Sequence, residues 1–218
     1  MVDGKTLKLS YTVMPLPWEQ LRPFGNLYVA YRDADTPSGE GKPWTIYASW
    51  VGNDKALFEQ WFKKRFKQTA CVFVPKAPLL ENEVTSYLKT KHTTGNVGWG
   101  VNKDGSAIKS GIRPVRITFE MDVISGTKAV GISSFSKQVL EVLLTIPPGE
   151  TRSYSWVADQ IQHSKAARAV GRALANNPFI LLVPCHRIIR EDGQLGGYVL
   201  SVSFKKALLE VERLRNCI

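Results

Sequence analysis

Cysteine and histidine are scarce in this chain, which has three of each among its 218 residues. The cysteines are Cys71, Cys185 and Cys217, and an odd, small number of this kind argues against a disulfide framework and for a reducing compartment. The histidines are scattered, and no pair of cysteines has the spacing of metal ligands. A disulfide-stapled fold and a zinc site are therefore not expected, and nothing in the sequence implies a cofactor.

Long apolar runs are also missing. No segment approaches the roughly 20 consecutive apolar residues that a membrane-spanning helix needs, and the first residues, MVDGKTLKLSYTV, lack the apolar core of a secretory signal. There is no internal repeat and no low-complexity tract. We expect a protein without a membrane partner, cytoplasmic in a prokaryote or nuclear in a eukaryote.

Acidic residues are fewer than basic ones: the chain has 19 Asp and Glu and 29 Lys and Arg, which gives a net charge of +10 and a pI of about 9.6. A basic balance is compatible with binding a nucleic-acid backbone. It is equally compatible with a merely soluble basic protein. Charge alone leaves both interpretations open.

The first part of the chain predicts alternating strands and helices. In several segments β-branched and aromatic residues recur at about every second position or form short apolar runs, which is typical of strands. In the segments between them the apolar residues have helical spacing. We expect strands at 7–13, 25–33, 44–52, 70–74 and 115–123, and helices at 53–68 and 79–90. Asn53 or Asp54 offers an N-cap, and the basic run Lys63 to Lys67 is interpreted as a solvated face. The strand at 70–74 should be buried, with Cys71 in the core.

Two glycine-rich segments divide the chain. Residues 93–114 are rich in Gly, Ser, Asn and Lys and predict a long loop or exposed hairpin. Residues 125–132 resemble a linker. We therefore expect an N-terminal α/β domain at 1–124 and a second domain at 133–218, which is mostly helical.

Three helices are expected in the second domain. The segment 133–146 is amphipathic, 153–161 has Ser153 as a possible N-cap, and 165–176 has Ser164 as its cap. The last two, joined by a short turn, fit a helix-turn-helix or an ordinary αα-corner. The third helix carries small residues around one arginine, Arg168: Ala166, Ala167, Ala169, Gly171 and Ala173. Such a helix suits a close approach to DNA or a tight contact with another helix.

The segment LLVPCHRIIRED places a thiol and an imidazole next to each other. Asn177-Pro178 predicts a turn, and the apolar run Phe179 to Val183 is long enough for a buried strand. Pro184 should stop that strand, so that the chain emerges at Cys185. A thiol reacts as its thiolate, and a neighbouring base lowers its pKa. Adjacent residues do not face each other, so His186 would act on Cys185 through folding or a bridging water.

Five segments in residues 133–212 together resemble the methylated-DNA–protein cysteine methyltransferases, also called O6-alkylguanine-DNA alkyltransferases. They are PPGETRSYSWVA, KAARAVGRAL, NNPFILLVPCHRII, GGY and KKALLEVE, in the family's order and spacing. The first half of the chain is similar to the family more loosely. The resemblance implies a ribonuclease-H-like N-terminal domain with an antiparallel sheet, and a C-terminal domain with a helix-turn-helix.

The resemblance also implies the chemistry. The protein would repair double-stranded DNA as a single-turnover, suicide methyltransferase without a cofactor. It would bind the minor groove as a monomer, flip an O6-alkylguanine out of the stack and move the alkyl group irreversibly to Cys185.

Residue by residue, the resemblance makes His186 the base that acts through a water, with Glu212 completing the relay, and Tyr154 the residue that contacts the flipped guanine. Arg168 would enter the gap in the stack. The small residues Ala166, Ala167, Ala169 and Gly171, with Ser164, would meet the DNA. The substrate pocket would include Asn177, Ile188, Tyr198 and Val199.

The sequence departs from the family at several points. Val199 replaces a small polar or basic residue, which removes a side-chain contact to O6, and Leu200 stands where glycine is frequent. The loop at 93–114 is longer than usual, and the zinc ligands of some relatives' N-terminal domains have no match.

Three alternatives remain at this point. A non-enzymatic alkyltransferase-like lesion sensor would lack the acceptor cysteine, whereas Cys185 is present. A cysteine hydrolase using Cys185 and His186 would need an oxyanion hole and a partner that orients the histidine. A helix-turn-helix DNA-binding protein without transfer would bind DNA and form no adduct.

Overall fold

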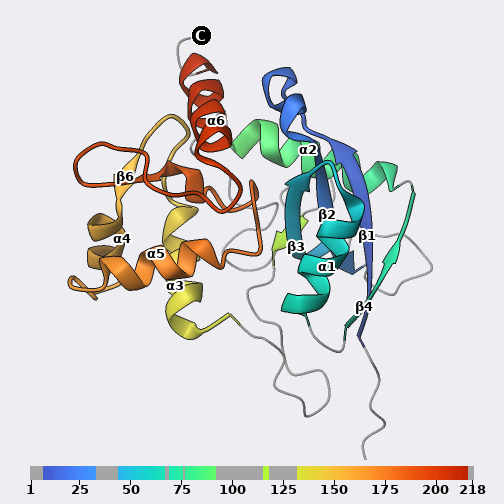
Figure 1. The fold of residues 1–218 in the computed structure, drawn as a ribbon, viewed down its shortest axis with the longest axis horizontal. Coiled ribbons are helices and arrows are strands. Elements are labelled where there is room, and N and C mark those ends of the chain that lie inside the picture. Colours follow the sequence, from blue (N-terminus) through green and yellow to red (C-terminus); the bar gives the residue numbers. More distant parts are fainter. Residues whose placement is uncertain are drawn as a thin grey trace, which may run out of the picture.

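The computed structural model describes residues 7–32, 44–66, 69–75, 77–91, 115–117 and 132–215. An N-terminal part built on a sheet with helices lies beside a mostly helical C-terminal part (Figure 1). The predicted loop at 93–114 and the linker, except Ile132, lie outside the described residues, as does Cys217. Within the described part of the chain no helix has the length and apolar character needed to span a membrane.

The N-terminal sheet has five strands in the order β4-β1-β2-β3-β5. Its three central strands, β1 (Leu7–Pro15), β2 (Asn26–Arg32) and β3 (Trp44–Gly52), are antiparallel neighbours. The two outer strands, β4 (Thr69–Phe73) and β5 (Val115–Ile117), pair parallel to β1 and β3. The expected antiparallel sheet is therefore correct for the centre only, because the chain reaches each outer strand through a connection that contains a helix, and the outer strand then runs in the same direction as its neighbour.

Helix α1 (Lys55–Arg65) covers one face of this sheet. The Asp54 side chain accepts hydrogen bonds from the backbone of Ala56 and Leu57, which is the predicted N-cap. Phe58 and Phe62 face the sheet and pack with Tyr11 and Tyr28 in an aromatic core.

The other face of the sheet forms one continuous core with helix α2 (Pro78–Lys91) and the C-terminal part. Residues that alternate along β2, such as Leu27 and Val29, point into this second core. A short 3-10 helix, η1 (Glu19–Phe24), adds an aromatic contact, since the ring centroids of Phe24 and Phe204 are 4.8 Å apart.

The strand at 70–74 is not the buried strand that its composition predicted. It forms β4 at the edge of the sheet, where Val72 is 55% exposed and Phe73 is 37% exposed. A run of apolar residues does not distinguish a central strand from an edge strand, because this depends on pairing with distant segments. The predicted core position of Cys71 concerns a side chain outside the described residues.

The C-terminal part is built from four α-helices and two short strands. The helices are α3 (Ser134–Leu143), α4 (Tyr154–Gln160), α5 (Ala167–Ala175) and α6 (Val202–Arg215). Strands β6 (Arg152–Ser153) and β7 (Ile188–Ile189) pair in parallel. The Ser153 hydroxyl caps α4 by accepting from Trp156 N, as predicted. Ser164 does not cap α5, which begins after Ala166 without a side-chain cap.

The apolar run before Cys185 is buried, but it is not a strand. Residues Phe179 to Val183 fold into a tight turn in which Val183 N donates to Phe179 O at 2.9 Å, and Leu181 has a φ of 71°. Isolated bridges join Phe179 to Ser49 and Ile180 to Val183. A five-residue apolar run predicts burial well, but its backbone shape depends on the polar groups that surround it.

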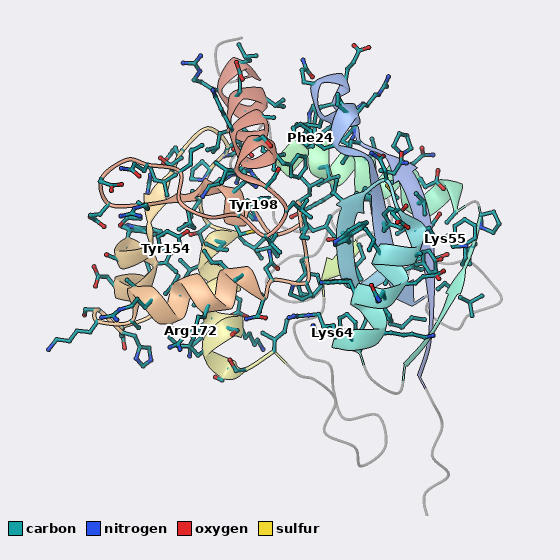
Figure 2. All side chains as sticks on the ribbon, viewed as in Figure 1. Phe24, Lys55, Lys64, Tyr154, Arg172 and Tyr198 are labelled. Atoms are coloured by element: carbon teal, nitrogen blue, oxygen red, sulfur yellow. The ribbon has the colours of Figure 1, made fainter. Side chains whose placement is uncertain are left out.

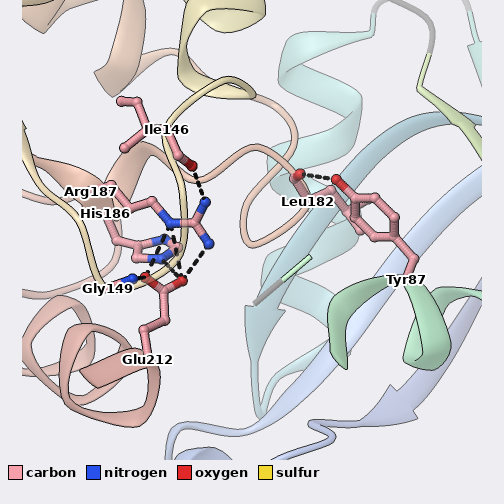
Figure 3. Close-up of polar contacts among 7 residues, drawn as sticks. All are labelled: Tyr87, Ile146, Gly149, Leu182, His186, Arg187 and Glu212. Carbon is pink, nitrogen blue, oxygen red and sulfur yellow. Dashed lines mark hydrogen bonds and ion pairs between the residues drawn. The ribbon is translucent and has the colours of Figure 1, made fainter. Parts of the chain in front are cut away.

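Those polar groups belong to the N-terminal part. The Ser49 backbone N–H donates to Pro178 O at 2.8 Å and its hydroxyl to Ile180 O at 2.8 Å. The Tyr87 hydroxyl donates to Leu182 O at 3.0 Å (Figure 3), and Arg65 donates to Asn176 O. Four alternate carbonyls of the segment 176–182 are thus held by the sheet and its two helices. This segment is the joint between the two parts of the protein.

Candidate active site

The thiol of Cys185 lies at the start of a single 3-10 turn, η2 (Cys185–Arg187). The preceding turn directs the chain inward: Cys185 N donates to Val183 O at 2.8 Å, and the residue is only 4% exposed. The prediction that the chain emerges at Cys185 is therefore wrong. Pro184 ends the apolar run, but the sulfur remains in the core and is reached through a cavity.

Asn177 holds the thiol from one side. Its Nδ2 donates to the Cys185 Sγ at 3.2 Å, while its Oδ1 accepts from Phe179 N at 2.9 Å. Burial raises the pKa of Cys185, and the hydrogen bond from Asn177 partly opposes that increase. Asn177 is 2% exposed, so it lies behind the sulfur as a support and does not line the cavity.

Tyr198 and Lys205 approach the sulfur from the loop after β7 and from α6. In the described part of the chain the Tyr198 hydroxyl is buried without a hydrogen bond of regular geometry, but its contact with the sulfur also lowers the pKa of Cys185. The Lys205 ammonium donates to Ile188 O and Leu195 O. Burial lowers the pKa of Lys205 to about 8, while the nearby thiolate acts in the opposite direction. At neutral pH Lys205 is a cation close to the thiol.

His186 and Glu212 are brought together, as the resemblance implied. The His186 Nε2 lies 2.9 Å from Glu212 Oε1, and both side chains are fully buried (Figure 3). Glu212 Oε2 also accepts from Gly149 N at 3.1 Å. A buried carboxylate in this position orients the imidazole and stabilises its protonated form.

Arg187 completes the same cluster, and the sequence reasoning missed it. Its Nη2 lies 2.7 Å from Glu212 Oε1 and its Nη1 donates to Ile146 O at 2.5 Å, with no exposed surface on the residue. The cluster ties η2, α6 and the end of the segment after α3 (Figure 3). A basic residue directly after a Cys-His pair is a weak signal, because most arginines are exposed.

A cavity of about 270 Å³ opens onto the sulfur. Its lining includes Tyr154, Tyr198 and Val199, which were predicted to contact the substrate, and Gly171, which was predicted to meet the DNA. Residues that were not predicted as part of the site also line it: Leu174, Ala175 and Gly197. Ile188 does not line it and is wholly buried in β7, paired with Arg152. Its place in the pocket wall was inferred from an apolar side chain close to Cys185, but the strand turns it into the core.

Tyr154 stands at the mouth of this cavity at the start of α4. Burial raises its pKa, as does the nearby Cys185, so the hydroxyl keeps its proton. Gly196, with a φ of 67°, passes close by, and a Cβ there would lie 3.2 Å from the Tyr154 hydroxyl. The first glycine of GGY therefore keeps the loop close to Tyr154 in a backbone conformation that favours glycine.

The exposed face of α5 differs from the expected arrangement. Arg168 is exposed, but it is not an isolated cation, because Arg172 is exposed one turn later on the same side. Figure 2 shows Arg172 on the outer side of the helix, away from the core. Ala173 is buried, whereas the other small residues are partly exposed: Ala166, Ala167, Ala169 and Gly171. Ser164 is exposed in the connection that precedes the helix.

No group of three or more His, Cys, Asp or Glu side chains in the described ranges is arranged to hold a metal ion. The chemistry offered by the described residues is that of a buried thiol with a nearby cation, two tyrosine hydroxyls and a histidine–carboxylate pair.

The Tyr198 hydroxyl is expected to set the reactivity of the thiol. In Tyr198→Phe the thiolate loses a polar contact, so the pKa of Cys185 rises further. Because a hydrogen bond to a charged group contributes about 1.5–3 kcal/mol, alkylation by iodoacetamide at neutral pH should slow about tenfold or more. The rate against pH should shift toward alkaline pH and meet the wild-type rate once both thiols are ionised.

Tyr154→Phe is the matched control for that measurement. It removes a hydroxyl from the same cavity, and among the described contacts this hydroxyl makes no hydrogen bond to the sulfur. Its pH profile for the thiol should follow the wild type. Equal shifts in both variants would mean that general polarity of the cavity, and not Tyr198, controls the thiol.

The described geometry defines a class of domain in which a basic helix lies beside a cavity that ends at a buried thiol. Residues 134–214 match the family described as 6-O-methylguanine DNA methyltransferase, DNA binding domain. This match confirms, for the C-terminal segment, the resemblance that was predicted from the sequence.

Named relatives agree with this assignment. The methylated-DNA–protein-cysteine methyltransferase of Mycobacterium tuberculosis strain H37Rv is 52% identical over 83 residues, which are 38% of this chain and 50% of the relative. The protein of the same name from Methanosarcina mazei is 46% identical over 80 residues, 37% of this chain and 51% of the relative. These alignments span about half the length of the curated relatives.

Solved structures extend the likeness to most of the chain. The Mycobacterium tuberculosis OGT in complex with DNA has a TM-score of 0.56 and 27% identity, with 94% of each chain covered. The O6-methylguanine-DNA methyltransferase of Pyrococcus kodakaraensis has a TM-score of 0.55 and 21% identity, with 94% of this chain and 98% of that chain covered, and shows the shared fold.

Proposed function

We propose that this protein repairs DNA by transferring a methyl or other alkyl group from O6-alkylguanine to its own Cys185, once and irreversibly. The observation that carries the proposal is the buried thiol at the end of a cavity that borders an exposed basic helix. The names of the relatives support it. Cytoplasmic or nuclear location and a monomeric state are part of the same proposal.

In the proposed reaction the Cys185 thiolate attacks the alkyl carbon. A carbon–sulfur bond forms, the bond between that carbon and O6 breaks, and its electron pair leaves with the guanine, which takes up a proton. The Tyr154 hydroxyl, which keeps its own proton, is placed to support that protonation. The thioether remains on the protein, and no second thiol is near Cys185 among the described residues to remove it.

The thiolate is formed by the relay that the sequence suggested. His186 takes the thiol proton through a water, and Glu212 stabilises the resulting imidazolium from 2.9 Å. Lys205 and Asn177 then stabilise the negative sulfur. Tyr198 and Val199 form the walls against which the alkylated base rests.

DNA recognition would use α4 and α5 as a helix-turn-helix, with α5 in the minor groove. The partly exposed small residues of α5 support a close approach, and Arg168 would fill the gap left by the flipped base. The N-terminal part would be ribonuclease-H-like, which is supported by antiparallel β1, β2 and β3 followed, after α1, by β4 beside β1.

The test is incubation of the protein with a duplex that carries one O6-methylguanine, followed by peptide mapping. One methyl group on the peptide that contains Cys185, with guanine restored in the DNA, is expected. Catalytic turnover without an adduct would indicate a hydrolase. Salt-dependent DNA binding with neither an adduct nor turnover would indicate a sensor or regulator.

Arg168→Ala is expected to slow repair of duplex DNA far more than reaction with a free O6-substituted guanine. The free base needs no extrusion, so a side chain that fills the vacated stack has no part in that reaction. Single-turnover rates on both substrates measure the difference. Arg168→Lys should also be slow on the duplex, because lysine keeps the charge but lacks the planar group that stacks.

Arg172→Ala is the matched control on the same face of α5. A residue that contacts only phosphate should lower duplex affinity and reduce its salt dependence, without a change in the single-turnover rate at saturating DNA. If Arg168→Ala behaves like Arg172→Ala, Arg168 is only an electrostatic contact. If Arg168→Ala and Arg172→Ala lose activity on the free base to the same degree as on the duplex, the two arginines support the structure of the protein.

A further inference from the structure

The basic end of α1 belongs to the N-terminal part, yet it lies against the end of α5. Arg65, in the last turn of α1, donates to the carbonyl of Asn176, the residue that caps α5. Figure 2 shows Lys64 at the end of α1 that faces α5, on the side of the molecule where Arg172 also lies. The two helices therefore present their C-terminal ends side by side.

Lys63 and Lys64 are exposed at this place. In the ranges that the structure describes, neither forms an ion pair with a carboxylate, whereas Lys55 at the other end of the helix lies 3.9 Å from Glu59. Basic side chains stabilise a helix C-terminus by a few tenths of a kcal/mol up to about 1 kcal/mol, and this effect would account for basic residues in the last turn of α1. That effect does not explain why the run adjoins the helix that would bind DNA.

The size of α5 gives a second reason. Its nine residues span only about 13 Å, and one face of a helix about 10 Å wide covers no more than a few hundred Å². Even single DNA-binding modules bury about 600–1,000 Å² of protein surface. A duplex seated on α5 must therefore contact the surface beyond the helix, and at its C-terminal end that surface is the end of α1.

We propose that Lys63 and Lys64 bind the phosphate backbone of the duplex beyond the C-terminal end of α5, with Arg65 as the residue that fixes their position. The partner is thus double-stranded DNA, bound by both parts of the chain. This inference rests on the proposed function, because it assumes that α5 contacts the duplex. The contacts would carry no sequence information, which suits a protein that meets lesions in any sequence.

The experiment compares the duplex affinity of wild type and the Lys63→Ala/Lys64→Ala variant over a range of salt concentrations. Each phosphate contact contributes about 0.9 to the slope of log affinity against log salt, so loss of two contacts should reduce the slope by about 1.8 and weaken binding about tenfold or more near 0.15 M salt. Reaction with a free O6-substituted guanine should be unchanged.

The matched control is Lys206→Ala/Arg213→Ala, which removes the same charge from exposed positions of α6. Helix α6 stands well apart from the joined ends of α1 and α5 (Figure 1). An equal change of slope in both variants, or no change in either, would overturn the proposal and leave the run as a solvated face.

Measuring affinity and adduct formation on duplexes of different length distinguishes a failure of this inference from a failure of the proposed function. On a long duplex the Lys63→Ala/Lys64→Ala variant should bind more weakly than wild type, and trimming the duplex should abolish the difference. If the difference persists on the shortest duplex that still reacts, the two lysines do not act beyond α5. If wild type binds no duplex and forms no adduct with either substrate, the proposed function itself fails.

Discussion

Cys185→Ser is expected to form no alkyl adduct with either duplex or free base, while its affinity for the duplex stays within about twofold of wild type. A serine hydroxyl stays protonated where a thiol ionises, and it is a weak nucleophile without strong activation. Binding should persist because the thiol is buried behind the cavity and the exposed face of α5 is unchanged. Mass spectrometry of the intact protein after incubation with O6-methylguanine DNA measures the adduct.

Serine is the better test than alanine because of the hydrogen bond from Asn177. Serine keeps an acceptor near Nδ2, whereas Cys185→Ala leaves a buried donor without its partner, at a cost of about 1–3 kcal/mol in stability. The Cys185→Ala variant then serves as the control that detects adducts formed on residues other than Cys185. An adduct formed at the wild-type rate by either variant would place the acceptor on another residue.

Glu212→Gln is expected to have the second largest effect, on rate and on stability together. Loss of the carboxylate weakens the relay through His186, raises the pKa of Cys185 and slows transfer by about 10²–10⁴-fold. It also leaves the Arg187 guanidinium buried without its counter-ion, and breaking a buried pair in this way costs about 3–5 kcal/mol. Urea unfolding measures the stability, and single-turnover transfer measured where the variant is fully folded gives the rate.

A double-mutant cycle with His186→Asn separates the two effects. If Glu212 acts on the reaction through His186, then Glu212→Gln should slow transfer no further once His186 is absent. The loss of stability should remain, because it arises from Arg187. Equal slowing in both backgrounds would show that Glu212 acts on the rate only by holding the fold.

The sequence predicted best what depends on neighbours in the chain. Asp54 and Ser153 cap their helices as expected, and the predicted helices and the first four predicted strands agree with the structure to within a few residues. Of the strand predicted at 115–123, residues 118–123 lie outside the described ranges. The sequence failed where distant segments decide: β4 at the sheet edge, the turn before Cys185 and the start of α5. Whether an apolar run becomes a strand depends on which donors meet its carbonyls, and those donors lie in Ser49 and Tyr87.

The same limit applies to the site. The pairing of His186 with Glu212 spans 26 positions, and it followed only from the family resemblance. Arg187 and Lys205 were missed because charged residues are seldom fully buried. Arg172 was not predicted as a second cation beside Arg168, although its spacing of four residues from Arg168 places both on one face of α5.

The joint at residues 176–182 limits how this protein can be divided. Backbone carbonyls in the joint accept hydrogen bonds from Ser49, Tyr87 and Arg65. The joint lies within the segment that matches the domain family, whereas these three donors lie outside it. A truncated chain that begins near residue 133 would expose those carbonyls, and with them the apolar surface of Phe179 and Ile180. We therefore expect the C-terminal part to be less stable alone than in the whole chain. Exchanging it between relatives should succeed only when the matching sheet is carried with it.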